Sequence, residues 1–316
     1  MAAGDLARGG IAPDAGHGRL IAPGLTPPPG IDVVIVSFRC EALLRDCLDS
    51  LFTHPPRGPI TVRVVDNASG DGTAAMVRRE FPRVELTENA ENLGFGRANN
   101  PALARGRASY ALVLNPDTRV TEGALDALVA LMEARAEIGI AGPRLELEDG
   151  SLDHASRRSF PTPVSALGHF TGLGRREGAP GALSAYRAPG VESGPVDAVN
   201  GAFMLIRRRA LEQVGAFDTR YWMYMEDLDL CYRFADAGWM TWFEPSATVI
   251  HVKAGTSGPH RSLRLNRAFH YGMYRFYRKF YAPHRAPLVN GFVYLGIGLK
   301  LAVSLVRAAL ARALGR

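Results

Sequence analysis

Short runs of β-branched residues alternate with helical patterns from Ile31 onward, and this alternation limits the chain to few fold classes. Strand–helix–strand units of this length are typical of a parallel sheet with helices on both faces. We therefore predict an α/β fold with a Rossmann-like, mostly parallel sheet flanked by helices. The expected strands are 31–37, 60–66, 83–88, 109–115 and 138–143, with helices near 41–52, 72–80, 95–107 and 121–134.

The chain is organised differently beyond these units. Residues 149–195 are rich in Gly, Pro, Ser and Arg and show no sustained period, which predicts a long loop. A further strand is expected at 201–208 and an amphipathic helix at 226–238. The first 30 residues lack a long apolar run and are expected to form a flexible leader. The predicted regions are therefore a leader over 1–30, an α/β domain over 31–257 and a helical extension over 258–316.

Charge is divided unevenly between the body of the chain and its tail. Residues 1–244 hold 25 basic and 31 acidic side chains, a net charge of −6. After Glu244 there are 12 Lys and Arg residues and no Asp or Glu, so the tail carries +12. Such an asymmetry indicates a polyanionic partner, either a nucleic acid or an anionic membrane surface.

Cysteine usage favours a reducing compartment. Cys40, Cys47 and Cys231 are odd in number and form no CxxC pair. This pattern argues against both a disulfide framework and a cysteine zinc site. We expect a cytoplasmic protein.

The basic tail is expected to lie on a membrane as an amphipathic helix. Residues 288–310 are largely apolar and long enough to span a bilayer in principle. However, Lys300, Ser304 and Arg307 recur at helical spacing, which would gather them on one side and leave the apolar residues mostly elsewhere. Upstream, aromatic residues interleave with basic ones, a mixture typical of membrane interfaces. The alternative is that both stretches pack against the α/β domain or a second subunit. The residues of this interleaved segment are Phe269, Tyr271, Tyr274, Arg275, Phe276, Tyr277, Arg278, Lys279, Phe280 and Tyr281.

Carboxylates stand at the expected ends of two strands. Asp66 lies in VVDNASGDGT and Asp117 in LNPDT. Ligands of open α/β sheets bind outside the carboxyl ends of the strands. There, Asp66 could accept a hydrogen bond from a ribose hydroxyl or a pyrimidine N–H, and Asp117 could hold a divalent cation with substrate phosphates. The alternative for both is a turn or a helix cap.

The strongest single signal is FDTRYWMYMEDLDLCYR at 217–233. Glu226, Asp227 and Asp229 open the predicted helix directly behind Tyr, Trp and Met side chains. Acids also suit this position through the helix dipole alone. Acids packed so closely are expected to couple, which raises the pKa of at least one toward the useful range of a general base.

In this order, the segments resemble the family 2 inverting glycosyltransferases of the GT-A fold, particularly the rhamnosyltransferase-like branch, over residues 31–281. The resemblance implies that Asp66 contacts the donor's base and that Asp117 holds Mg²⁺ or Mn²⁺. It also implies that Asp227, with Glu226 as the fallback, is the catalytic base and that His251 completes the metal or diphosphate site. The matching segments are VIVSF, VVDNASGDGT, ENLGFGRANN, LNPDT, VNGAFMLIRR, FDTRYWMYMEDLDLCYR and the stretch from His251 to Ser257.

The same resemblance implies substrates and contact residues. The expected donor is a nucleoside-diphosphate sugar, with rhamnose as a candidate sugar. The expected acceptor is a glycan or polyprenyl-linked sugar in cell-envelope polysaccharide synthesis. The reaction would take place at the inner face of the cell membrane. A homo-oligomer is left open and no nucleic acid is expected. We assign Ser37, Asn92, Gly94, Arg97 and Asn115, besides Asp66, to the donor, and Gly201, Ala202 and Trp222 to the acceptor.

Two departures from the family pattern and one absent signature shape these expectations. Asn115 replaces the first acid of the Asp-x-Asp metal motif, and Arg39 replaces the usual Asn after the first strand's aromatic residue. The QxxRW signature of processive polysaccharide synthases is absent, so we expect one sugar, or very few, per acceptor.

Two other function classes compete with this interpretation. A nucleotidyltransferase would also place Asp on the edge of an α/β sheet, but SFRCEALL after the first strand lacks its glycine-rich signature. A nucleic-acid-binding protein would explain the basic tail with its aromatic residues, but the body is acidic and its motifs are carboxylates.

Overall fold

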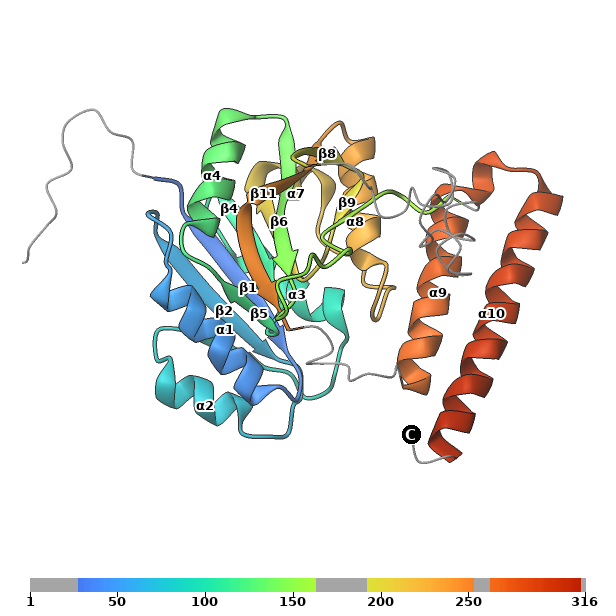
Figure 1. The fold of residues 1–316 in the computed structure, drawn as a ribbon, viewed down its shortest axis with the longest axis horizontal. Coiled ribbons are helices and arrows are strands. Elements are labelled where there is room, and N and C mark those ends of the chain that lie inside the picture. Colours follow the sequence, from blue (N-terminus) through green and yellow to red (C-terminus); the bar gives the residue numbers. More distant parts are fainter. Residues whose placement is uncertain (1–27, 163–191, 253–261, 314–316) are drawn as a thin grey trace, which may run out of the picture.

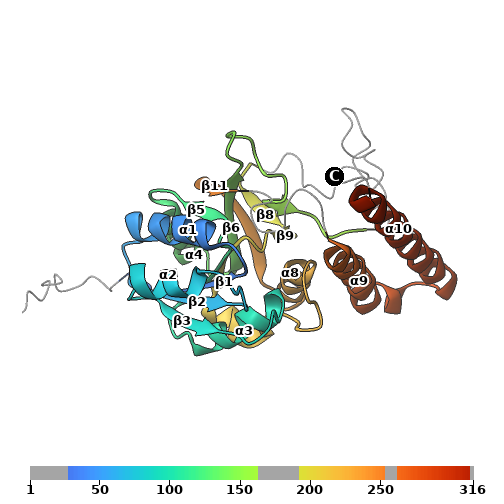
Figure 2. The same ribbon diagram turned by 90° about the horizontal axis from the view of Figure 1, so that it is seen from below.

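The computed structural model describes residues 28–162, 192–252 and 262–313. Most of the predicted leader, the middle of the 149–195 loop and the predicted boundary between 257 and 258 lie outside the described residues. A mixed sheet forms the centre of the fold, helices cover both of its faces, and a helical hairpin lies beside it (Figure 1, Figure 2).

The central sheet has nine strands in the order β3-β2-β1-β4-β10-β6-β11-β5, with β8 paired to β11. Its strands are β1 (Ile31–Ser37), β2 (Ile60–Asp66), β3 (Glu85–Glu88), β4 (Tyr110–Leu114), β5 (Thr118–Val120), β6 (Ile138–Glu146), β8 (Gly194–Val196), β10 (Phe203–Arg207) and β11 (Met240–His251). A second small sheet pairs β7 (Arg157–Arg158) with β9 (Ala198–Val199).

The helices connect these strands or extend beyond them. They are α1 (Glu41–Thr53), α2 (Thr73–Glu80), α3 (Phe95–Arg105), α4 (Ala124–Ala134), α7 (Arg208–Val214), α8 (Glu226–Asp236), α9 (Leu263–Phe280) and α10 (Pro287–Ala313), with a 3-10 turn η3 (Ala282–His284).

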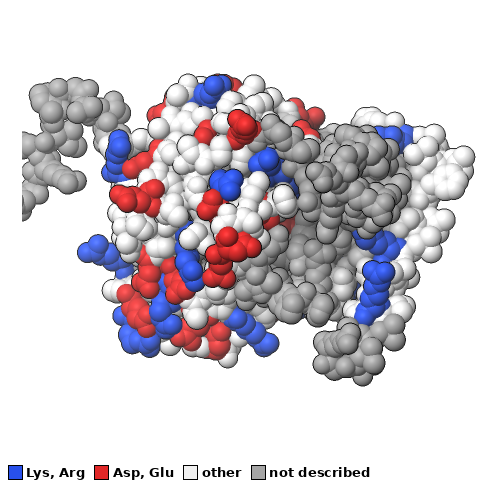
Figure 3. Space-filling view, viewed as in Figure 1, with Lys and Arg blue, Asp and Glu red and all other residues white. Residues whose placement is uncertain are grey.

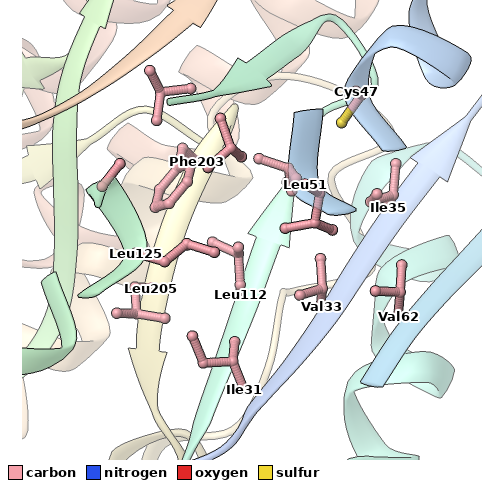
Figure 4. Packing of buried hydrophobic residues seen from close by; sticks show 14 of the residues in the cluster. Ile31, Val33, Ile35, Cys47, Leu51, Val62, Leu112, Leu125, Phe203 and Leu205 are labelled. Atoms are coloured by element: carbon pink, nitrogen blue, oxygen red, sulfur yellow. The ribbon is translucent and has the colours of Figure 1, made fainter. Parts of the chain in front are cut away.

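Side chains of the central strands alternate between two apolar cores, one on each face of the sheet. Val33 and Ile35 of β1 join the core under α1, α2 and α4, whereas Val34 joins the core under α3, α7 and α8. Figure 4 shows the first of these cores, where Leu112 of β4 lies near Val33 and Leu51 of α1. Burying each such side chain contributes roughly 1.5–3 kcal/mol, so both faces stabilise the sheet.

Four of the eight strand pairs in the central sheet are parallel, and β10 runs against both of its neighbours. The pairs β3–β2, β2–β1 and β1–β4 are parallel, as are β6 and β11. By contrast, β10 is antiparallel to β4 and to β6. Its beginning therefore lies at the edge where its neighbours β4 and β6 end, and the loop before Phe203 reaches that edge.

The helical extension is a hairpin of α9 and α10. Ser262 caps α9 because its Oγ accepts a hydrogen bond from the N–H of Leu265 at 3.3 Å. Helix α9 packs on the α/β domain through Phe276, which is buried and meets the ring of Tyr232 of α8 at 5.8 Å. In α10, Pro287–Ala309 is the one candidate membrane span in the described part of the chain, with a mean hydropathy of 1.7 over its apolar window.

Two expectations about the tail need correction. Arg275 and Lys279, predicted to face a membrane, form ion pairs with Asp218 at 3.2 Å each. Lys300 and Ser304, predicted to form a polar surface with Arg307, are half-buried, whereas Arg307 is exposed. Residues 287–313 do form a helix, but Lys300 and Ser304 are less exposed than a polar surface shared with Arg307 would require.

Candidate active site

The ends of three neighbouring strands bring three predicted residues together. Ser37 of β1 lies opposite Asp66 of β2 in the parallel register, and Asn115 follows β4 on the other side of β1. The carboxyl edge of the sheet therefore carries these side chains side by side. Arg97, another predicted donor residue, is exposed near the start of α3.

Asp66 is buried within the turn that leads to α2. Its Oδ1 accepts a hydrogen bond from the Ser69 hydroxyl, and that hydroxyl oxygen also accepts the backbone N–H of Arg39 at 2.9 Å. Arg39 and Ala68 adopt positive φ angles of 53° and 62°. The turn after β1 and the turn after β2 thus each contain one residue in this costly conformation, and the Arg39–Ser69 hydrogen bond joins the two turns.

Asn67 organises the loop over 92–94, a role that was not predicted from the sequence. Its Nδ2 donates to Asn92 Oδ1 at 3.1 Å and to the Gly94 carbonyl at 3.2 Å, and its Oδ1 accepts the N–H of Leu93 at 3.0 Å. The amides of this loop are thereby fixed next to Asp66. The signal for Asn67 was present, because it lies in the VVDNASGDGT segment.

Trp222, which we predicted to contact the acceptor, forms hydrogen bonds with the same loop. Its carbonyl accepts the N–H of Phe95 at 2.9 Å, and its indole N–H donates to the carbonyl of Asn92 at 3.4 Å. Gly94 has φ +82°, and a Cβ there would lie 2.1 Å from the Trp222 carbonyl oxygen. Only glycine fits this contact between the predicted donor loop and the aromatic segment before α8.

Asp117 and His251 approach each other across two antiparallel strands. His251 Nε2 lies 3.7 Å from Asp117 Oδ1, and its Nδ1 lies 2.9 Å from Asp153 Oδ2. All three side chains are buried. Asp153 therefore orients the imidazole so that Nε2 faces Asp117, an arrangement common behind metal ligands. Asp153 lies in the loop after β6, where no sequence signal marked it.

The loop over 200–202 connects the Asp117 segment to the predicted base. Asn115 N–H donates to the Ala202 carbonyl at 2.8 Å, and Gly201 N–H donates to Asp227 Oδ2 at 3.1 Å. Ala202 is itself buried. The reversed direction of β10 brings this loop to the carboxyl edge, so Asn115 and Asp227 share one support.

Asp227 is held by a half-buried ion pair that was also not predicted. Arg158 Nη2 donates to Asp227 Oδ2 at 2.6 Å and to the Val199 carbonyl at 2.7 Å. The other carboxylate oxygen, Oδ1, accepts the N–H of Leu228 at 2.8 Å. Three donors thus fix the orientation of this carboxylate at the start of α8.

The three acids of α8 have different environments. Burial, followed by the negative charge of Asp227, raises the pKa of Glu226 to about 8. Asp229 is fully buried and accepts hydrogen bonds from Arg233 at 2.7 Å and Lys279 at 2.6 Å. The expectation that one of the grouped acids has a raised pKa is confirmed for Glu226, while Asp229 has a structural role.

Backbone strain lies directly before these acids. Tyr224 and Met225 have φ angles of 71° and 72°, a conformation that non-glycine residues seldom adopt. Two consecutive residues of this kind turn the aromatic segment sharply into α8. Strained residues held by surrounding structure are typical of functional sites.

Comparison with known proteins identifies the family. The profile of the glycosyltransferase-like family 2 matches residues 27–271. The chain is also 35% identical over 241 residues to the N-acetylglucosaminyl-diphospho-decaprenol L-rhamnosyltransferase of Mycobacterium tuberculosis, a match that covers 72% of this chain and 78% of that protein. The chain is a family 2 glycosyltransferase. It is also 31% identical over 165 residues to the rhamnosyltransferase WbbL of Escherichia coli, covering 50% of this chain and 60% of that one.

Solved glycosyltransferases share the fold. A mannosyltransferase from Pyrobaculum calidifontis, solved with GDP-Man and Mn²⁺, is 20% identical with a TM-score of 0.56, and covers 90% of this chain and 76% of its own. Residues 1–349 of Staphylococcus aureus TarS, solved with UDP-GlcNAc, give 14% identity and a TM-score of 0.56 over 85% and 71% of the two chains. The predicted GT-A fold is confirmed, and the family excludes the nucleotidyltransferase and nucleic-acid-binding alternatives as primary functions.

The donor atoms near Asp117 fit a divalent cation bound together with a diphosphate. One carboxylate and one imidazole face each other there, and the described residues contain no group of three or more His, Cys, Asp or Glu ligands. Mg²⁺ is usually held by one or two carboxylates, with substrate phosphates and water completing the shell. The two side chains therefore suit a cation whose remaining ligands come from the donor.

Proposed function

We propose that this glycosyltransferase moves a sugar, with rhamnose as the first candidate, from a nucleoside-diphosphate donor to a hydroxyl of a polyprenyl-linked glycan. The configuration of the sugar carbon would be inverted in a single displacement. The name of the mycobacterial relative supports both the sugar and the lipid-linked acceptor, because that match covers 78% of the relative.

The observation that carries this proposal is the support shared by Asn115 and Asp227. The 200–202 loop bonds both segments, so the proposed diphosphate site around Asp117 and the proposed base lie on either side of one short loop. A single displacement needs this arrangement, with the leaving group on one side of the sugar carbon and the attacking hydroxyl on the other.

The proposed base is Asp227. Its carboxylate is held by Arg158, Gly201 and Leu228, and would accept the proton of the acceptor hydroxyl as that oxygen attacks the sugar. Glu226 is less suitable because its side chain is buried, whereas Asp227 is partly exposed. We therefore retain Glu226 as a supporting residue and not as the base.

On the donor side, we propose that Asp66 receives the nucleoside and that the amides of the 92–94 loop face the phosphates. Ser37, Asn92, Gly94, Arg97 and Asn115 remain our assigned donor residues. Asp117 and His251 would hold the cation, Mg²⁺ or Mn²⁺, with Asp153 orienting the imidazole. When bound, the cation supplies positive charge against the departing diphosphate. Trp222, Gly201 and Ala202 remain our assignment for the acceptor side.

We propose that the reaction takes place at the cytoplasmic face of the cell membrane. All three cysteines are buried and unpaired, which suits a reducing compartment. A polyprenyl-linked acceptor would be embedded in the membrane, so the enzyme would work at its surface.

The direct test is a transfer assay with N-acetylglucosaminyl-diphospho-polyprenol and a panel of nucleoside-diphosphate sugars. Mass spectrometry of the lipid product should detect one added deoxyhexose, and NMR of a soluble analogue should detect the inverted anomeric configuration. Transfer of a different sugar would exclude rhamnose. Retention of configuration would exclude the single displacement with Asp227 as base.

A further inference from the structure

The outward side of α10 is a continuous apolar stripe. Its residues are spaced by four, three, four, four and three, so they fall on one side of the helix. Each is between 51% and 73% exposed. We call this set the outward stripe, and it consists of Leu288, Phe292, Leu295, Leu299, Val303 and Val306.

The polar residues of α10 lie mainly on the opposite side, against α9. The Tyr277 hydroxyl donates to Asn290 Oδ1 at 2.8 Å, and the ring of Tyr294 lies 5.2 Å from that of Tyr274. Lys300 and Ser304 are also half-buried. A soluble helix would show the reverse pattern, with its apolar side packed and its polar side in water. An apolar surface this long is typical of an interaction site.

The positive charge around the outward stripe favours an anionic partner. The part of the chain after Glu244 contains no acidic residue. In the view of Figure 3, the hairpin accordingly shows Lys and Arg but no Asp or Glu. Arg278, Arg285 and Arg307 are exposed, and no carboxylate of the described residues pairs with them. A second copy of the chain would bring two surfaces of the same charge together, whereas anionic lipid headgroups would complement them.

The hairpin is firmly attached to the helix that carries the proposed base. Lys279 of α9 binds Asp229 of α8 at 2.6 Å, and Phe276 is buried against Tyr232 of the same helix. For α10 to cross a bilayer, it would have to leave its contacts with α9 and carry Lys300 into hydrocarbon. Both changes are unfavourable, because charged side chains at the centre of a bilayer are costly.

We propose that the outward stripe docks on an anionic bilayer with α10 lying parallel to the membrane surface. The stripe then enters the boundary between headgroups and acyl chains, as amphipathic interfacial helices do. The α8–α9 contacts hold Asp227 in a fixed relation to that surface. This inference rests on the proposed function in one respect only, the purpose of docking, which is to present Asp227 to a lipid-linked acceptor.

Vesicle binding by the full chain tests the docking surface without donor or acceptor. Wild-type protein should sediment with vesicles containing phosphatidylglycerol, bind pure phosphatidylcholine less, and be released by high salt. Leu299→Glu should weaken this binding at least about tenfold, since it puts a charge in place of an exposed apolar side chain that docking would bury in the bilayer. Met240→Glu is the matched control, because Met240 is an exposed apolar residue on the α/β domain and should leave binding unchanged. Both variants should keep the wild-type melting temperature and transfer to a soluble acceptor.

Fluorescent labels that report depth test the orientation. Labels at Leu288→Cys, Leu299→Cys and Val306→Cys should all report the same shallow position, and the native cysteines are buried. A deep label at 299 between shallow ends would overturn the parallel orientation in favour of a spanning helix. Equal vesicle binding by Leu299→Glu and wild type would overturn the docking surface itself. A wild-type dimer that Leu299→Glu dissociates, without vesicle binding, would assign the stripe to self-association.

Vesicle binding needs neither the donor nor the acceptor. It can therefore fail while sugar transfer succeeds, and sugar transfer can fail while vesicle binding succeeds. The two proposals are therefore tested separately.

Discussion

Arg158 Nη2 lies 2.6 Å from Asp227 Oδ2, so a residue on a two-residue strand of the small second sheet holds the carboxylate that we propose as the base. Replacing it tests whether this contact sets the orientation of the base. Arg158→Gln should lower kcat/KM by about a hundredfold, because small misplacements of a reacting group have effects of this size. Arg158→Lys should recover part of the loss. Arg157→Gln, at the neighbouring residue that stacks on Phe243, should keep near wild-type kcat/KM.

Asp227→Asn removes the proposed base without changing its shape. Turnover should fall by roughly 10²–10⁴-fold, the usual effect of losing a general base, while donor binding by calorimetry stays unchanged. Asp236→Asn, at the exposed end of the same helix, is the control. Near-normal turnover of Asp227→Asn would assign the base to another residue.

Glu226, the buried acid next to Asp227, predicts how the stability of the protein depends on pH. The folded-state pKa of Glu226 is raised from 4.5 to about 8, so the folded protein binds this proton more tightly than the unfolded chain. Its contribution to stability is therefore present below about pH 4.5 and is lost as the pH rises toward 8. Melting temperatures of Glu226→Gln should fall less over this range than those of wild type. The same slope in both proteins would show that Glu226 is not the titrating group, and exposed Glu137→Gln controls for loss of a surface charge.

Asp153 is expected to affect metal binding through His251. Asp153→Asn should weaken Mn²⁺ binding by about 10–100-fold, the range found when partners behind metal ligands are lost. Mn²⁺ titration followed by electron paramagnetic resonance, with nucleoside diphosphate present, measures this without turnover. Asp149→Asn is the matched control because Asp149 is exposed in the same loop and bonds Ser151. Unchanged Mn²⁺ affinity in Asp153→Asn would separate Asp153 from the metal site.

The attachment of the hairpin depends on Lys279. Lys279→Met leaves the fully buried Asp229 with Arg233 as its remaining ion-pair partner, so the free energy of unfolding should fall by about 3 kcal/mol. Urea denaturation measures the change. Arg278→Met, one position earlier and exposed, should change stability by less than about 0.5 kcal/mol. Equal stability of the two variants would mean that α9 is not anchored by this ion pair.

The parallel half of the sheet could be predicted closely. Expected strands 31–37 and 60–66 coincide with β1 and β2, because strands buried on both faces are continuous β-branched runs. The direction of β10 relative to its neighbours could not be predicted, because side chains alternate along a strand in the same way whether it is parallel or antiparallel. Strands β5, β8 and β9 are two or three residues long, too short to give a period.

Some residues of the candidate site could likewise be predicted from the sequence, and others could not. Asp66 and Asp117 could be predicted because each follows a strand with a strong pattern. Asp153 and Arg158 could not, because they lie in an aperiodic segment and meet partners 98 and 69 residues away. The outward side of α10 depends on where α9 packs, which the spacing of Lys300 and Arg307 does not encode.

The reversed strand β10 also separates two recognition tasks along the chain. The residues that we assign to the donor lie within 37–117, apart from His251, whereas those assigned to the acceptor and the base lie within 201–227. Strand β10 enters between β4 and β6 as a distinct insertion in the order of the sheet. Substitutions within 201–227 can therefore change the residues that we assign to the acceptor while the assigned donor residues stay in place.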